Sequence, residues 1–205
     1  MLHSLAALVD VEKPIGPQLR ESAEIASQQL PEGSYSAHMY RFVIAQYQQG
    51  VPWEQVRDAL YQKYQVNQEA GYDISAQKLY CNGCFAAGIN FAASLISYFY
   101  GEGDLKETIK IAVLAGWDSD NPAATWGGLL GFIYGRRGVE DAFGRQFADQ
   151  YNIHRTRANF PNHGLDDFAA MASRGLEIVD RVVTGEMAGQ LNVKTDSWQI
   201  PPLKK

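Results

Sequence analysis

The sequence has few cysteines, few charged residues and no long apolar run. Its 205 residues include only Cys81 and Cys84, which excludes the disulfide-rich framework of a small secreted domain and makes a reducing cytoplasm the expected compartment. No stretch reaches the roughly 20 consecutive apolar residues that a transmembrane helix requires. The short apolar stretch near the N-terminus is not preceded by basic residues. Neither a membrane partner nor a signal peptide is therefore expected.

The charge balance argues against one class of partner. Charged residues make up 20% of the chain and the formal net charge is -5. Because a phosphate backbone attracts a positive field, no nucleic-acid partner is expected. The low charge content indicates that part of the surface is covered in the working protein, by a partner, by a second copy in a homo-oligomer, or by more of the same polypeptide.

Apolar residues recur with helical spacing along most of the chain, and no segment shows the alternation of a strand. Residues 81–101 are apolar on nearly every face, which is typical of a buried central helix. The sequence therefore predicts an all-α bundle of about eight helices. Residues 1–185 are expected to form one helical domain, followed by an extended tail over residues 186–205. The expected helices cover residues 17–30, 34–49, 52–64, 81–101, 105–114, 122–134, 139–151 and 165–184.

Two aspartates, Asp118 and Asp120, stand one residue apart in front of an expected helix. Asn121 is a favourable N-cap and Pro122 suits the first helical position, so both carboxylates are expected in the preceding turn. Carboxylates in one turn can converge, and a cation between them relieves their repulsion. Mg²⁺ prefers such oxygen ligands, and the Ser119 hydroxyl is a further candidate. A solvated capping turn is the alternative.

The expected helix after these aspartates has glycine at every fourth position, at Gly127, Gly131 and Gly135. A glycine inside a helix costs about 1 kcal/mol relative to alanine. The three glycines therefore predict that another backbone approaches this face closely. Such packing would hold the aspartate turn in a fixed direction.

The segment from Gly116 to Asp120, Gly-Trp-Asp-Ser-Asp, is followed by Ala-Ala-Thr at 123–125 and Gly-Gly-Leu-Leu-Gly at 127–131. This run resembles the C-terminal signature of the ADP-ribosylglycohydrolases. The flanks are similar too, with Asn82 in Cys-Asn-Gly-Cys and a Gly-Asp-Leu turn at 103–105. The similarity covers roughly residues 18–185.

The resemblance implies an all-α fold with two Mg²⁺ or Mn²⁺ ions in a cleft. It also implies hydrolysis of the glycosidic bond that joins ADP-ribose to a protein side chain or a small-molecule acceptor. Trp117 is a candidate for stacking on adenine or lining the cleft. The candidate metal ligands are Asp118, Asp120, Ser119 and Asn121, and the candidate substrate contacts are Trp117, Asn82 and Gly116.

The sequence departs from the family pattern in three places. Asn121 stands where the family has a threonine ligand, and Ser119 replaces another threonine. The family's N-terminal Gly-Asp-x-x-Gly and Asp-Asp-Thr segments have no counterpart, since the only Asp-Asp pair is Asp166-Asp167. The chain thus resembles a C-terminal portion that lacks the N-terminal part, and the catalytic acid or base is unknown. A catalytically silent binding or assembly module derived from the family is the alternative function.

Cys81 and Cys84 have the Cys-x-x-Cys spacing of several functional motifs. A zinc site needs a second pair of ligands, which the sequence does not offer at ligand spacing. A redox dithiol would normally lie in a βαβ context. The two cysteines are expected to be small buried residues at the start of a helix.

Overall fold

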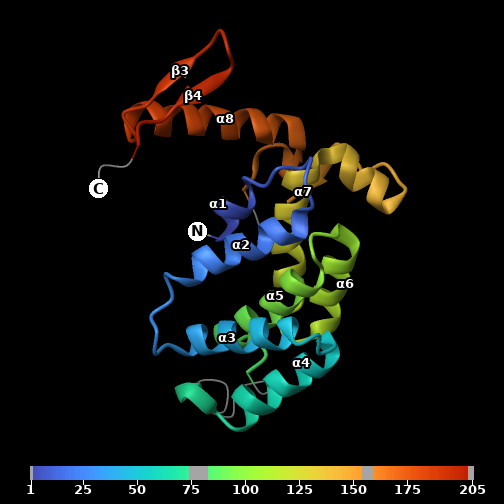
Figure 1. The fold of residues 1–205 in the computed structure, drawn as a ribbon. Helices are drawn as coiled ribbons and strands as arrows, with labels where there is room; N and C mark the ends of the chain where they lie inside the picture. The colour runs from blue at the N-terminus through green and yellow to red at the C-terminus, as the bar shows by residue number, and fades with distance from the viewer. Residues whose placement is uncertain (1, 74–82, 154–158, 203–205) are drawn as a thin grey trace. The chain divides into compact units, whose positions relative to one another are not determined.

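Helices account for most of the structure (Figure 1). The computed structural model describes residues 2–73, 83–153 and 159–202. It confirms the predicted all-α class, with eight α-helices in those ranges. The helices are α1 (Leu2–Ala6), α2 (Ile15–Ser27), α3 (Tyr35–Gln48), α4 (Trp53–Leu60), α5 (Ala87–Tyr100), α6 (Leu105–Ala115), α7 (Asp120–Phe143) and α8 (Phe168–Gly185). Shorter helical segments are η1 (Tyr61–Val66), η2 (Glu69–Gly71) and η5 (Pro161–Gly164).

The chain divides into two compact units, Met1–Arg145 and Gln146–Lys205. The sequence predicted a single helical domain over residues 1–185, and this domain boundary stays a prediction. Within the described ranges, no helix is both long enough and apolar enough to cross a bilayer.

Helix α5 is the central element of the first unit. Nine of its fourteen residues are buried, and it packs against α2, α3, α4, α6 and α7. This confirms the predicted buried helix, although α5 begins at Ala87 and residues 83–85 form a turn before it.

Polar groups on the core aromatic residues bond to main-chain carbonyls of neighbouring helices. The Tyr98 hydroxyl on α5 donates to the Leu19 carbonyl of α2 at 2.9 Å, and burial raises the pKa of Tyr98. The Trp126 indole on α7 donates to the Ser94 carbonyl of α5 at 2.9 Å. Buried aromatic residues usually find such partners. These bonds fix α7, and therefore the turn that precedes it, against α5.

The glycines of α7 do not mark a close backbone approach within the described structure. A Cβ at Gly127 would lie 3.5 Å from the Ile109 side chain, which is ordinary contact. A Cβ at Gly131 would meet only Val139, at 3.7 Å, among the described atoms. Gly135 instead has φ 66° and breaks α7 into two helical segments. The packing reason that the sequence suggested for these glycines is therefore wrong.

The second unit contains α8 and two short antiparallel hairpins, which the sequence did not predict. One hairpin pairs β1 (Gln150–Asn152) with β2 (Leu165–Asp167), and the other pairs β3 (Gln190–Asn192) with β4 (Ser197–Gln199). The predicted extended tail thus includes a hairpin. Strands of three residues are too short to show period-two alternation, which explains why the pattern was missed.

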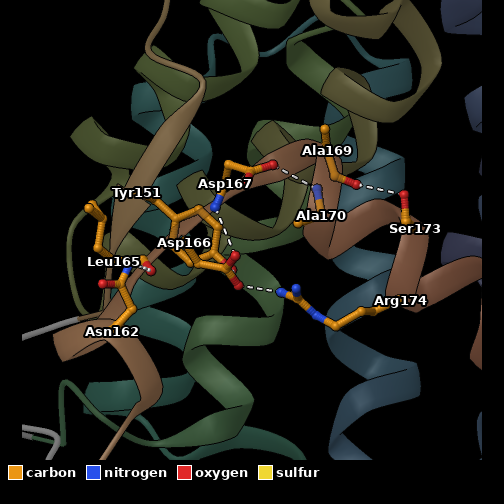
Figure 2. A network of polar contacts seen from close by, with 9 residues as sticks. All are labelled: Tyr151, Asn162, Leu165, Asp166, Asp167, Ala169, Ala170, Ser173 and Arg174. Carbon is orange, nitrogen blue, oxygen red and sulfur yellow. Dashed lines mark hydrogen bonds and ion pairs between the residues drawn. The ribbon is translucent and has the colours of Figure 1, made fainter.

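Asp166 and Asp167 organise the junction between β2 and α8 (Figure 2). The Asp167 carboxylate accepts the Ala170 amide at 2.7 Å and caps α8. Asp166 forms an ion pair with Arg174 and accepts the Tyr151 hydroxyl at 3.1 Å. The Asp167 amide, assisted by Arg174 and Tyr151, lowers the pKa of the Asp166 carboxyl.

Substitution of Gly101 by alanine tests the contact between α5 and α6. A Cβ there would lie 2.0 Å from the Thr108 hydroxyl and 2.7 Å from the Thr108 Cα. Because the Cα cannot move without shifting α6, we expect Gly101→Ala to lower the free energy of unfolding by about 1–3 kcal/mol in urea denaturation. Gly33→Ala is the control, since no described atom lies within 4 Å of that site. Equal losses in both variants would contradict the assignment.

Substitution of Asp167 by alanine tests the cap of α8. Loss of the bond to the Ala170 amide is expected to destabilise the first turn by about 1 kcal/mol. Hydrogen exchange at the Ala170 amide measures the effect directly. Asp167→Asn retains the accepting oxygen and should exchange at nearly the wild-type rate. Equal acceleration in the two variants would show that the side-chain oxygen is not the cap.

Candidate metal and substrate site

The aspartate turn joins two helices that pack side by side. Helix α6 ends at Ala115 and α7 begins at Asp120. Gly116 has φ 94° and Trp117 has φ 56°, so two successive residues adopt the left-handed region. For a non-glycine residue such as Trp117 this costs on the order of 1–3 kcal/mol. A tight reversal here places Asp118 and Asp120 together at the start of α7.

The start of α7 differs from the prediction by two residues. Ser119, and not Asn121, occupies the N-cap position, and its side chain makes no capping bond. Asp120 and Asn121 therefore lie in the first turn, and Pro122 is the third helical residue. Asp120 is favourably placed for the helix dipole, whose positive end attracts carboxylates.

Asp120 lies close enough to Asp118 to affect its titration. Burial, together with a side-chain contact and the nearby charge of Asp120, raises the pKa of Asp118 above its ordinary 3.8. The side chain of Asp118 is half-buried, whereas Asp120 is exposed. Two like charges this close repel, and a proton or a cation relieves the repulsion.

The other predicted ligands lie close by in sequence but are less clearly directed. The Thr125 hydroxyl donates to the Asn121 side-chain oxygen at 3.5 Å, so this oxygen partly serves the helix. Ser119 is half-buried. Among the described residues, no group of three or more histidine, cysteine or acidic side chains could hold a metal ion.

The donor set fits one hard cation with an incomplete protein shell. Mg²⁺ is commonly held by one or two carboxylates, with water and substrate phosphates completing an octahedron. Asp118 and Asp120 supply two such carboxylates. Two ions, as the resemblance implied, would need oxygen ligands beyond the four predicted residues.

A cavity of about 590 Å³ adjoins this turn, between α4, η1 and the end of α6. Its volume lies within the range of small-molecule sites. Gly116 and Trp117, two of the three residues predicted to contact substrate, line this cavity, and Trp117 also packs against the core. The cavity is completed by Arg57, Asp58, Tyr61, Gln62, Leu114 and Ala115.

Sequence reasoning missed Asn90, which contacts the aspartate turn directly. Its side-chain oxygen accepts the Asp118 amide at 3.0 Å, across 28 residues of sequence. The signal was available, because Asn90 is the one amide side chain in the mostly apolar helix α5.

Two further predictions concern the turn before α5. Asn82 and Cys81 lie outside the described residues. Cys84 is half-buried and forms a disulfide, so it is neither the buried thiol that was expected nor a zinc ligand in this state. The Asp166-Asp167 pair serves the cap and ion pair of Figure 2, in agreement with its mismatch to the family's Asp-Asp-Thr segment.

The fold and the aspartate turn together describe an all-α protein with a carboxylate pair at a helix start. The sequence model of the ADP-ribosylglycohydrolase family matches residues 2–175. Because the match covers most of the chain, the protein belongs to the ADP-ribosylglycohydrolase family, which is a family of hydrolases. A search of curated proteins and a search of solved structures gave no match.

Asp120→Asn tests the convergence of the two carboxylates in metal-free protein. Because the pKa of Asp118 is higher in the folded protein than its ordinary value of 3.8, Asp118 stabilises the folded state below pH 3.8. This contribution to the free energy of unfolding declines as the pH rises through the pKa of Asp118 in the folded protein. Removing the Asp120 charge should lower the pKa of Asp118 and flatten this decline. Carbon-13 NMR titration of the Asp118 carboxyl measures the shift. An unchanged pKa would show that the side chains do not interact.

Proposed function

We propose that the protein is a divalent-metal-dependent hydrolase that cleaves the glycosidic bond between ADP-ribose and an acceptor. The observation that carries this proposal is the placement of two aspartates at one helix start, with Asp118 in the turn before α7 and Asp120 as the first residue of α7. These residues occupy the two aspartate positions of the signature that the sequence resembles, and the chain belongs to that family. The acceptor is a protein side chain or a small molecule.

In this proposal Asp118 and Asp120 hold Mg²⁺ or Mn²⁺, and Ser119 and Asn121 supply further oxygens. The bound cation would orient the ribose hydroxyls and polarise a water molecule. The carboxylate pair has two functions of its own. It concentrates negative charge at the start of α7, and it presents that charge at a fixed place, because the Trp126 indole holds α7 against α5.

The adjoining cavity is the proposed place for part of the ADP-ribose. Trp117 and Tyr61 offer aromatic surface to a purine. Arg57 can pair with phosphate, but its guanidinium already contacts Asp58 at 2.8 Å. A phosphate would therefore compete with the Asp58 carboxylate, and nucleotide binding should weaken this surface ion pair, which is worth little on its own.

Isothermal titration calorimetry with Mn²⁺ tests the metal site. Wild type and Asp141→Asn should bind, because Asp141 lies exposed near the far end of α7. Asp118→Asn and Asp120→Asn should each weaken binding by more than about 100-fold, the upper end of what losing an outer-shell partner costs. Binding that is the same in all four proteins would remove these aspartates from the metal site.

Release of free ADP-ribose from ADP-ribosyl-arginine, followed by chromatography, tests the reaction. We expect turnover by wild type with Mg²⁺ and its loss in Asp118→Asn. Metal binding without turnover would exclude arginine as the acceptor and would favour the catalytically silent binding module.

A further inference from the structure

We infer that Asn90 is the positioning residue of the aspartate turn, and that it sets the direction of the Asp118 carboxylate. This inference rests on the proposed function, in which the direction of the Asp118 carboxylate matters because Asp118 binds the metal ion. Asn90 lies in the first turn of α5 and its side chain is half-buried.

The Asn90 amide is used on both of its sides. Its oxygen accepts the Asp118 main-chain N–H at 3.0 Å. Its nitrogen donates to the carbonyls of Cys84, at 2.7 Å, and Ala86, at 3.0 Å. An amide is the side-chain group that accepts one bond and donates two from adjacent atoms.

These bonds also determine the orientation of the amide. The group on the Asp118 side is a donor and needs an oxygen, whereas the two carbonyls need N–H groups. An aspartate at position 90 would accept from Asp118 but oppose both carbonyls with negative charge. A leucine of similar volume would make none of the three bonds.

The bond to Asp118 acts at the point where the chain leaves its left-handed conformation. Gly116 and Trp117 both have positive φ, and the turn then enters α7. Strained backbone persists only where the surroundings hold it. The Asp118 N–H is held by α5, and the residue after Asp118 is the N-cap of α7, so the backbone is held on both sides of the Asp118 Cα and the direction of the Cα–Cβ bond is restricted. Asn90 thereby orients the Asp118 carboxylate through the Asp118 main chain.

Asn90→Leu and Asn90→Ala separate positioning from packing. If the amide positions Asp118, both variants should accelerate hydrogen exchange at the Asp118 amide in metal-free protein and weaken Mn²⁺ binding about 10–100-fold. If Asn90 only fills space, Asn90→Leu should behave as wild type and Asn90→Ala should not. Ser94→Ala is the control, because the Ser94 hydroxyl donates to the Asn90 main-chain carbonyl at 2.8 Å, so this change removes a neighbouring hydrogen bond of α5 and leaves the Asn90 side-chain amide in place.

The exchange measurement keeps this inference distinct from the proposed function. If wild type fails to bind Mn²⁺, the proposed function falls, and the Asp118 amide still reports whether Asn90 holds the turn. Wild-type exchange and Mn²⁺ affinity in Asn90→Leu, at an unchanged melting temperature, would overturn the inference. Acceleration in Asn90→Leu with Ser94→Ala unchanged would support it.

Discussion

The site depends on holding two negative charges close together at one helix start. Burial and the neighbouring Asp120 carboxylate both raise the pKa of the Asp118 carboxyl. Such an arrangement is unfavourable in the absence of a counter-charge. It persists because the surrounding backbone is fixed, by the reversal at Gly116 and Trp117 and by the bond from the Asp118 amide to Asn90. The rest of the first unit can be understood as the support for this turn.

The support comes from one central helix. Helix α5 accepts the Trp126 indole of α7 through the Ser94 carbonyl and contacts the aspartate turn through Asn90. One rigid, buried element thus locates both the turn and the helix that follows it. Rigid helices hold a constellation of ligands more accurately than loops do. The cavity is lined on one side by Gly116 and Trp117, the two residues of this turn that precede Asp118.

Much of this fold could be predicted from periodicity, and the failures have local causes. The helices around Val43 and Leu60 were found because apolar residues recur there at helical spacing. The helix around Ile96 was found because it is apolar on nearly every face, and all three of these residues are buried. The start of α7 was misplaced because Asn121 and Pro122 suit a helix start in general, while the reversal at Trp117 brings the helix in two residues earlier. The prediction that another backbone packs against the glycines of α7 was wrong, because the sequence does not show which neighbouring element faces them. Asn90 was missed because its partner is distant in sequence.

The central claim is that one divalent cation lies between the carboxylates of Asp118 and Asp120. Anomalous X-ray scattering from crystals grown with Mn²⁺ tests this claim most directly. The account predicts a peak in contact with an oxygen of each aspartate, at roughly the 2.0–2.1 Å typical of such small hard cations. A peak elsewhere, or side chains that point apart into solvent with no peak between them, would contradict the account.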